Sequence, residues 1–348
     1  MKVPFRRNIA RMAGYVPGVQ PQEQGFVKLN TNENPYPPSP AVRRAIMAEP
    51  AASLRLYPDP DATRLRKQAA LTYGFDISRV IAGNGSDDLL AMVARAFIGE
   101  GNSLCCPTPT YTLYDTLVGV QGGKIIGVPY PGDYSLPADL AKKRAKVTIV
   151  ASPNSPSGTS VPTSVLADLA DRVPGVLVID EAYADFAEET ALSLAREKGN
   201  VIVLRTFSKS FSLAGVRIGL GFAHPAILEG LNKVRDSYNV SRLAIAAGEA
   251  ALRDISWMET NVAKIRKTRA ALISALPSLG FIPFPSQSNF VLARRAGGRS
   301  ARPVYEKLKA RKVLVRYFDT PRLAGCLRIT VGTDDEVGSL LAALREIS

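Results

Sequence analysis

Between residues 79 and 206, short runs rich in β-branched residues alternate with runs that have helical spacing, and this alternation most restricts the fold. The predicted strands are 79–85, 103–107, 124–130, 146–152, 175–180 and 200–206, and the predicted helices are 86–98 and 163–173. Gly, Pro and Asn bound most of these runs. Parallel neighbouring strands need a long return connection, usually a helix. The sequence therefore predicts an α/β domain with a mostly parallel sheet.

The length and the flanking segments predict two domains and an arm. A chain of 348 residues exceeds the roughly 250–300 residues at which single cores stop growing. Residues 1–29 are polar and interrupted by Pro and Gly, so we expect an N-terminal arm, followed by a large domain over 30–240. From 241 the pattern changes to a long helical stretch, 241–276, and then to strand-like and helical runs. This pattern predicts a smaller α+β domain over 241–348.

The charge favours small anionic partners. The net charge is +13, but the 44 Lys and Arg are spread along the chain, and the longest basic block has only three residues, Lys142, Lys143 and Arg144. A nucleic-acid surface normally shows clustered basic residues. We therefore expect a basic surface that favours small anions, with no nucleic-acid partner; charge that serves only solubility fits equally well.

Cysteine and histidine usage narrows the chemistry. Cys105, Cys106 and Cys326 form no CxxC pair, which suits a reduced interior better than a disulfide framework. His224 is the only histidine and has no second His to share a metal, so neither a metal site nor a hydrolase triad is predicted. No apolar segment resembles a secretion signal or a membrane span. We expect a cytoplasmic protein with no membrane partner.

Three different polar residues each follow a predicted strand. Asn154, Asp180 and Lys209 are separated by 26 residues (180 minus 154) and 29 residues (209 minus 180), about the length of one crossover unit. Right-handed crossovers would place all three along one edge of the sheet. Open α/β sheets bind ligands at that edge. By itself, Asp180 in "VLVID" fits a helix cap or a surface acid equally well.

A lysine at such an edge has a chemical use. An amine that is partly removed from water and close to a cation such as Arg217 is more readily neutral, and the neutral amine forms Schiff bases. Pyridoxal phosphate needs a lysine, a carboxylate that keeps its ring nitrogen protonated, and donors for its phosphate. Lys209 and Asp180 supply the first two.

Two segments are candidates for the phosphate. Gly83 and Gly85 permit a tight turn before Ser86, which begins a helix whose first backbone N–H groups attract anions. A simple helix cap explains this stretch as well, and acids at 87 and 88 would repel a phosphate unless they point away. Thr206, Ser208 and Arg217 around Lys209 form the second candidate segment.

These residues resemble the fold-type I pyridoxal-phosphate-dependent aminotransferases, and within them the class II histidinol-phosphate aminotransferase group. The resemblance covers nearly the whole chain, in the motifs "KLNTNENPYPPSP", "YPDP", "GNGSDDLL", "PTPTYTLY", "ASPNSPSGT", "VLVIDEAYADF", "RTFSKSFSLAGVRIG", "YNVSRLA", "SNFVL", "VLVRYF" and "LRITVGT". It implies a large domain built on a mostly parallel seven-stranded sheet flanked by helices, and a smaller α+β domain.

The resemblance also implies roles around the cofactor, pyridoxal 5'-phosphate. Lys209 would be the Schiff-base lysine and Asp180 would face the pyridine nitrogen. Tyr183 and Asn154 would hydrogen-bond the 3-hydroxyl oxygen, and Tyr111 would stack on the ring. Tyr111 and Tyr183, and also Tyr57, could instead be aromatic residues of the core with no role toward the cofactor.

The same likeness implies a phosphate site shared between subunits. The residues implied to surround the phosphate are Gly85, Ser86, Thr206, Ser208 and Arg217. Tyr57 of "LYPDP" would reach the phosphate from the partner subunit, so the resemblance implies a homodimer.

For the substrate, the resemblance implies two anion-binding arginines. Arg328 would bind a carboxylate and Arg316 would be a second anion clamp, although either could be a surface ion-pair residue. Tyr15, Asn32 and Tyr238 would line the pocket. The implied reaction is a transamination of L-histidinol phosphate with 2-oxoglutarate that gives imidazole acetol phosphate and glutamate, a step of histidine biosynthesis.

Other functions remain open. Aromatic amino-acid aminotransferases and threonine-phosphate decarboxylase share nearly all of these motifs and differ in the substrate pocket. A regulatory or nucleic-acid-binding protein is the non-enzymatic alternative, but the sequence shows no helix-turn-helix extension.

Overall fold

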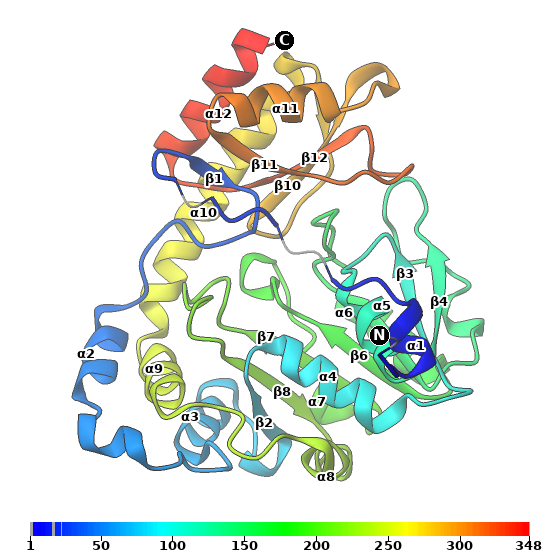
Figure 1. The fold of residues 1–348 in the computed structure, drawn as a ribbon, viewed down its shortest axis with the longest axis vertical. Coiled ribbons are helices and arrows are strands. Elements are labelled where there is room, and N and C mark those ends of the chain that lie inside the picture. The colour runs from blue at the N-terminus through cyan, green and yellow to red at the C-terminus, as the bar shows by residue number, and fades with distance from the viewer. Residues whose placement is uncertain (1–2, 16–17, 22, 348) are drawn as a thin grey trace.

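The structure is a computed structural model, and it describes residues 3–15, 18–21 and 23–347. In Figure 1 a larger sheet with its helices fills one half of the molecule and a smaller sheet with α10, α11 and α12 fills the other. The predicted arm also includes residues 1–2, 16–17 and 22, and the predicted smaller domain includes residue 348; these lie outside the described residues.

Within the described residues, the larger sheet has seven strands in the order β2-β8-β7-β6-β5-β3-β4. Its strands are β2 (Val80–Gly83), β3 (Ser103–Thr108), β4 (Lys124–Pro129), β5 (Val147–Ala151), β6 (Val176–Asp180), β7 (Val201–Thr206) and β8 (Gly219–Ala223). Strands β3 to β7 are parallel, and β8 is antiparallel to both of its neighbours. The predicted fold, an α/β architecture with a mostly parallel seven-stranded sheet, is confirmed.

Strand β8 has no counterpart in the sequence-based prediction. Its sequence, "GLGFA", is rich in glycine and lacks the β-branched residues that mark the other strands. A Cβ at Gly219 would lie 2.5 Å from the backbone carbon of Gly85, so only glycine fits this close approach. The short connection from β7, residues 207–218, has no crossover helix, and β8 therefore returns antiparallel. Lys209 lies in this connection.

The smaller sheet has five strands among the described residues, in the order β1-β11-β12-β10-β9. Its strands are β1 (Val27–Leu29), β9 (Phe281–Pro283), β10 (Phe290–Arg295), β11 (Val313–Tyr317) and β12 (Cys326–Thr330). Strand β1 comes from the predicted arm and pairs in parallel with β11. The first residues after β1 therefore pass directly from the smaller sheet toward the larger one.

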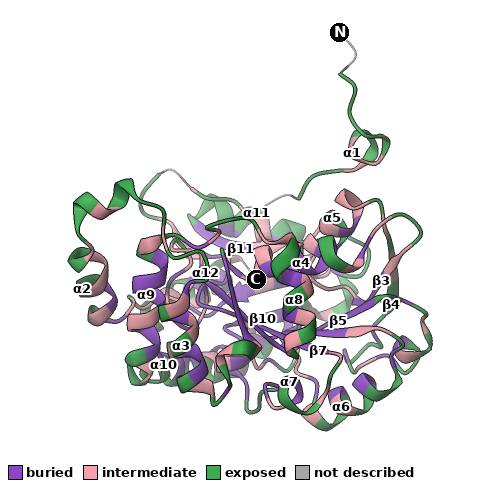
Figure 2. Cartoon of the chain, turned by 90° about the horizontal axis from the view of Figure 1, so that it is seen from below, coloured by how far each residue is buried: buried purple, intermediate pink, exposed green. Residues whose placement is uncertain are grey.

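Helices surround both sheets. They are α1 (Arg7–Arg11), α2 (Pro40–Ala48), α3 (Thr63–Tyr73), α4 (Ser86–Phe97), α5 (Leu113–Val120), α6 (Thr163–Arg172), α7 (Leu194–Glu197), α8 (Pro225–Val234), α9 (Arg242–Arg253), α10 (Ile255–Ala275), α11 (Arg302–Ala310) and α12 (Asp334–Ile347). Figure 2 shows the buried surfaces of most of these helices turned toward the interior, while the short α1 lies on the outside and contacts α5, where Asn8 donates to the backbone oxygen of Gly119 at 2.8 Å. No described helix is both long enough and apolar enough to cross a membrane.

The helical stretch predicted over 241–276 is two helices. Asp254 interrupts it with φ −117° and ψ 50°, and its carboxylate accepts a hydrogen bond from Ser39. Helix α9 then packs on α2 and α3, while α10 reaches the smaller sheet. The domain boundaries at 29/30 and 240/241 stay predictions.

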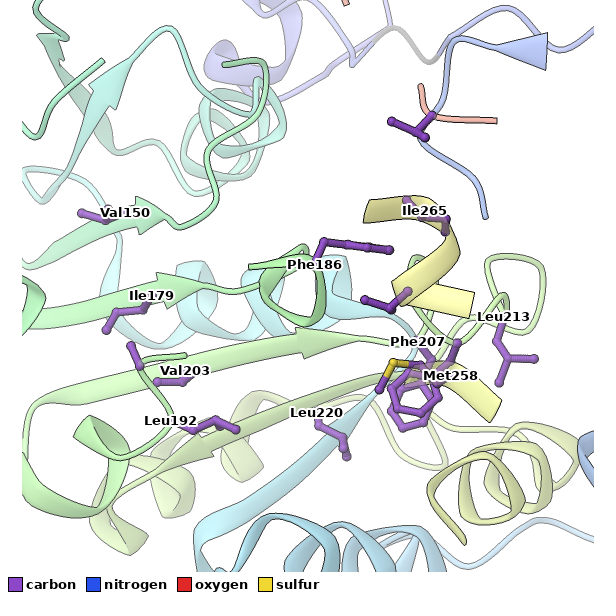
Figure 3. Close-up of a cluster of buried hydrophobic side chains, with 14 of the residues drawn as sticks. Val150, Ile179, Phe186, Leu192, Val203, Phe207, Leu213, Leu220, Met258 and Ile265 are labelled. Atoms are coloured by element: carbon purple, nitrogen blue, oxygen red, sulfur yellow. The ribbon is translucent and has the colours of Figure 1, made fainter. Parts of the chain in front are cut away.

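The largest buried cluster joins the two halves. It includes Phe207 from the connection after β7 together with Met258 and Ile265 of α10, which Figure 3 shows beside Phe186. Burying a large apolar side chain contributes about 1.5–3 kcal/mol. This packing anchors the connection that carries Lys209.

Candidate active site

Asn154, Asp180 and Lys209 all lie at the carboxyl edge of the larger sheet. They follow or end the adjacent parallel strands β5, β6 and β7, and Ala151 at the end of β5 is paired with Asp180. The crossover spacing in the sequence places the three residues here, because each unit returns the chain to the same edge.

A cavity of about 260 Å³ opens at this edge, between the larger sheet and the smaller one. The predicted site residues that line it are Tyr15, Asn32, Ser86, Tyr111, Asp180, Tyr183, Thr206, Ser208, Lys209, Arg217, Arg316 and Arg328. Four other predicted residues do not line it: Gly85, Asn154, Tyr57 and Tyr238. The cavity thus gathers side chains from segments up to about 300 residues apart in the sequence.

Lys209 is half-buried in the cavity wall. Its Nζ donates a hydrogen bond to the backbone oxygen of Thr31 at 3.3 Å and lies 5.7 Å from the centroid of the Tyr183 ring. Asn34 donates to the backbone oxygen atoms of Lys209 and Ser210 at 3.1 and 3.0 Å, which holds the peptide around the lysine. The amine is therefore positioned by its backbone and forms no ion pair with an acid among the described residues.

Asp180 is a buried carboxylate, only 5% exposed. Its Oδ2 accepts from the hydroxyl of Tyr114 at 2.6 Å and its Oδ1 accepts from the backbone N–H of Ala182 at 3.1 Å. Burial raises the pKa of Asp180 to about 6, and the two hydrogen bonds oppose this rise. No ion pair to Asp180 exists within the described residues, so a cationic group in the cavity would meet an uncompensated carboxylate.

Asn154 is 1% exposed and lies behind the cavity wall. Its Oδ1 accepts from the Thr110 hydroxyl at 2.8 Å, and its Nδ2 donates to the Pro109 backbone oxygen at 3.3 Å and to the Ser157 hydroxyl at 2.9 Å. The amide therefore has its partners within the protein. Its role toward the 3-hydroxyl oxygen of a cofactor stays a prediction.

The hydroxyl of Tyr183 faces the segment after β1. Asn32, 1% exposed with a left-handed φ of 57°, donates from Nδ2 to the Tyr183 hydroxyl at 2.9 Å. Thr330 of β12 donates to Asn32 Oδ1 at 3.1 Å and accepts from its backbone N–H at 3.0 Å. Asn32 thus joins the two sheets next to Lys209.

One end of the cavity has the donors of an anion site. Arg217 donates to the Ser208 hydroxyl at 3.3 Å, and the backbone N–H of Ser208 donates to Thr206 at 3.2 Å. Ser86 begins α4 there, preceded by Gly85 at φ +86°. Backbone N–H groups at a helix start, hydroxyls and a guanidinium together suit a phosphate.

The two acids in the first turn of α4, Asp87 and Asp88, lie on different sides of the cavity wall. Asp88 turns away from the cavity, where it accepts from the backbone N–H of Asn84 and the side chain of Asn239 at 2.9 and 2.8 Å. Asp87 lines the cavity and pairs with Arg217 at 3.2 Å. A phosphate at this end would compete with Asp87 for that guanidinium.

The smaller sheet supplies two arginines to the opposite side of the cavity. Arg316 of β11 and Arg328 of β12 are paired residues across the antiparallel strands, and the Phe318 ring lies 5.3 and 5.4 Å from the two guanidinium carbons. Arg328 donates to Ser155 at 3.0 Å and to the Asn30 backbone oxygen at 3.1 Å, while its Nε has no partner among the described residues. Burial lowers the pKa of Arg328. Two neighbouring cations that form no ion pair within the described chain suit an anionic substrate.

Three predicted tyrosines occupy different positions. Tyr15 contacts the Tyr111 ring edge-on at a centroid distance of 5.9 Å and lines the cavity. Tyr57, 77% exposed, instead stacks on Tyr238 at 4.5 Å, outside the cavity. Their roles toward a partner subunit and a substrate stay predictions.

The residues present fit pyridoxal phosphate. A lysine and a buried carboxylate that lacks a cation face one cavity, and the anion site lies at its end. A Cβ at Gly85 would lie 2.6 Å from Nη2 of Arg217, so a side chain at 85 would fill the space beside the guanidinium. Lys209, Asp180 and the donors around Arg217 would hold the aldehyde carbon, the ring nitrogen and the phosphate, respectively.

Sequence reasoning missed several residues that build the site. They are Asn30, Thr31, Asn34, Thr110, Tyr114, Ser155 and Phe318, together with the buried ion pairs of Arg205 with Glu181 and Asp185. All of these residues stand in the motifs that carry the family resemblance, and those motifs are the only signal for them in the sequence. Their roles in the site depend on contacts between distant segments, which have no local pattern.

Comparison with known proteins supports this assignment of the fold. The sequence matches the aminotransferase class I and II family over residues 24–344. Histidinol-phosphate aminotransferase from Syntrophotalea carbinolica is 47% identical over 345 residues, 99% of each chain. Histidinol-phosphate aminotransferase 1 from a Nostoc species is also 47% identical, over 99% of this chain and 98% of its own.

A solved structure shows the same architecture. The crystal structure of histidinol-phosphate aminotransferase from Sinorhizobium meliloti in complex with pyridoxal-5'-phosphate is similar with a TM-score of 0.91 and 27% identity, covering 100% of this chain and 99% of that one. By its fold, the chain is of the fold-type I class of pyridoxal-phosphate-dependent enzymes. It belongs to the aminotransferase class I and II family.

Proposed function

We propose that this protein is a pyridoxal-phosphate-dependent histidinol-phosphate aminotransferase. It would transfer the amino group of L-histidinol phosphate to 2-oxoglutarate, giving imidazole acetol phosphate and glutamate, in histidine biosynthesis. The observation that carries the proposal is one cavity with a lysine and a buried carboxylate on one side and, on the other, two arginines that form no ion pair with any described residue. The identity of 47% with a histidinol-phosphate aminotransferase along 99% of both chains supports the substrate.

The roles of the residues follow from their positions. The chemistry that pyridoxal phosphate supplies when bound is a carbonyl that accepts an amino group and a ring that takes up negative charge. Lys209 Nζ would accept and return the substrate proton as a general base and acid. Asp180 would hold a proton on the ring nitrogen, because an ionised carboxylate in a dry site favours a neighbouring cation.

The arginines would bind both substrates in turn. Histidinol phosphate has a phosphate and no carboxylate, whereas 2-oxoglutarate has two carboxylates. A guanidinium forms paired hydrogen bonds with either group, so Arg316 and Arg328 can serve both halves of the reaction. Phe318 and Tyr15 would exclude water from the bound anion.

We further propose a cytoplasmic homodimer. Leu54, Leu56 and Tyr57 are 57%, 52% and 77% exposed on one segment, which is unusual for such side chains and suits a protein interface. The buried free cysteines support a reducing compartment. Mixing Lys209→Ala chains with Tyr57→Ala chains tests the shared site. Activity should return in the mixture if Tyr57 serves the partner's cofactor, and inactive mixtures would contradict it.

A spectral titration tests the substrate. The purified protein loaded with pyridoxal phosphate would be titrated in parallel with histidinol phosphate, phenylalanine and threonine phosphate. We expect histidinol phosphate to change the cofactor absorbance at the lowest concentration. A stronger response to phenylalanine, or release of carbon dioxide from threonine phosphate, would replace the proposed substrate.

A further inference from the structure

Within the described residues, the side chain of Tyr114 has a single hydrogen-bond partner, Asp180. Its side chain lies in the first turn of α5, is 1% exposed, and packs in the cluster on the α4 and α5 side of the larger sheet. The hydroxyl donates to Asp180 Oδ2 at 2.6 Å, the distance expected for a hydroxyl and a charged acceptor. A buried hydroxyl therefore points directly at the carboxylate predicted to face the cofactor.

The two donors hold both oxygens of Asp180. Tyr114 occupies Oδ2, and the backbone N–H of Ala182 occupies Oδ1 at 3.1 Å. A carboxylate has about four acceptor positions. Rotation of the side chain would break both hydrogen bonds, so the orientation is defined while acceptor capacity remains for a ring N–H in the cavity.

The surroundings of Asp180 otherwise favour the neutral acid. Burial is the largest influence, and Asp87 from α4 and Glu181, which follows β6, also raise the pKa of Asp180. The other ionisable groups that line its cavity are Tyr111, Tyr183, Lys209 and Arg217, joined by Tyr15, Arg316 and Arg328 on the far side. The Tyr114 hydroxyl is the one side chain that donates to Asp180 within the described residues, and it favours the ionised form.

We propose that Tyr114 is a positioning residue that keeps Asp180 ionised and oriented toward the ring nitrogen of the cofactor. Its neighbour Thr110 acts in the same way on Asn154, through the 2.8 Å hydrogen bond to Oδ1. The Tyr111 ring contacts the Tyr114 ring edge-on at 5.6 Å and 82°. One short segment, 110–114, thus holds the side chains of Asp180 and Asn154 and also contributes Tyr111 to the cavity wall. The inference rests on the proposed function, because it gives Asp180 its role toward the ring.

The experiment compares Tyr114→Phe with Tyr130→Phe. Both tyrosines are buried, at 1% and 3% exposure, but the hydroxyl of Tyr130 has no partner within the described residues. Tyr130→Phe therefore controls for removing a buried hydroxyl. Two quantities would be measured: the pKa of Asp180 in the cofactor-free protein, by carbon-13 NMR of labelled aspartate with Asp180→Asn for assignment, and the dissociation constant of pyridoxal phosphate.

For Tyr114→Phe we expect the pKa of Asp180 to rise by about one unit, since each unit corresponds to about 1.4 kcal/mol between the two protonation states. The dissociation constant of the cofactor should rise about tenfold, as for loss of a hydrogen bond to a charged group. Tyr130→Phe should change neither. An Asp180 pKa and a cofactor affinity that both stay at their wild-type values in Tyr114→Phe would overturn the inference.

A second variant decides the question if Tyr114→Phe does not fold. A 3-fluorotyrosine at position 114 keeps the ring and the hydroxyl but is a stronger donor, so the pKa of Asp180 should fall. An unchanged or higher pKa would overturn the inference. The NMR measurement needs no cofactor. Wild-type protein that fails to bind pyridoxal phosphate would therefore defeat the proposed function, whereas an unresponsive Asp180 defeats only the role of Tyr114.

Discussion

The two walls of the cavity differ in how completely their polar groups are paired. On the side of the larger sheet, Asp180 in the cavity wall and Asn154 behind it have hydrogen-bond partners on every polar side-chain atom. On the wall from the smaller sheet, Arg316 and Arg328 face each other across two strands with no acidic partner in the described chain. The first wall is therefore preorganised to hold a cofactor that stays bound, and the second suits anionic substrates that bind and dissociate.

This difference predicts that the cofactor and the substrates are bound in different ways. A group held by preorganised partners is bound without reordering the protein, which favours tight binding. Neighbouring cations without counter-ions carry a desolvation cost that an incoming anion relieves. Substitutions on the first wall should therefore change cofactor binding or chemistry, and substitutions on the second should change the apparent affinity for substrates.

The largest effect is expected at Lys209. Lys209→Ala removes the amine that carries protons, so kcat should fall by at least about 10³-fold, the range of general acid–base catalysis. The absorbance of lysine-linked cofactor should disappear as well. Turnover assays and absorbance spectra would show this. Lys198→Ala, which breaks a surface pair with Asp171, is the control, and normal turnover of Lys209→Ala would remove the lysine from the mechanism.

A smaller effect is expected on the second wall. Arg328→Ala should raise KM for both substrates about 10- to 100-fold, since hydrogen bonds to charged groups are worth roughly 1.5–3 kcal/mol. Cofactor affinity should not change. Steady-state kinetics and cofactor titration would separate the two, with the exposed Arg302→Ala as control. A weaker affinity for the cofactor and an unchanged KM would contradict the assignment of Arg328 to substrate binding.

The buried carboxylate should cost stability in the cofactor-free protein. The folded-state pKa of Asp180, about 6, lies above its ordinary value of 3.8, so the folded state binds more protons than the unfolded state between these values. Its contribution to stability is therefore present below about pH 4 and is lost as the pH rises toward 6. Asp180→Asn should stabilise the cofactor-free protein at pH 7 by about 3 kcal/mol, and by less at pH 5.

Urea denaturation of the cofactor-free proteins at pH 5 and pH 7 would measure this difference. The same variant should lose activity, because Asn cannot hold the proton on the ring nitrogen as a carboxylate does. A stabilisation that is equal at both pH values would mean that the titration of Asp180 is not its source.

The smallest effect is expected at Gly85. Gly85→Ala places a methyl group 2.6 Å from Nη2 of Arg217, so the guanidinium must move and cofactor affinity should fall about tenfold. Gly122→Ala is a matched control, because Gly122 has a φ of +75° and no atom within 4 Å of its Cβ position. Both variants should lose about 1–2 kcal/mol of stability from the left-handed backbone. Equal cofactor affinities in the two would exclude the steric effect on Arg217.

Much of the fold and part of the site follow from local sequence patterns. The β-branched runs and their crossover spacing predict the parallel sheet, and the same spacing carries Asn154, Asp180 and Lys209 to one edge, because each crossover unit returns to it. Strand β8 and the break at Asp254 are different. Gly219 is required by its close approach to Gly85, and Asp254 accepts from Ser39, so both depend on contacts with distant segments.

The sequence by itself determined which residue types the site contains and on which strands they lie, since strand and helix periods are local properties of the chain. Only the tertiary structure decided their partners: Tyr114 for Asp180, Thr110 for Asn154, and Phe318 between the two arginines. Hydrogen bonds and ring contacts join atoms a few ångströms apart in space, whatever their separation along the chain. Sequence spacing cannot specify them until the strands and helices are packed.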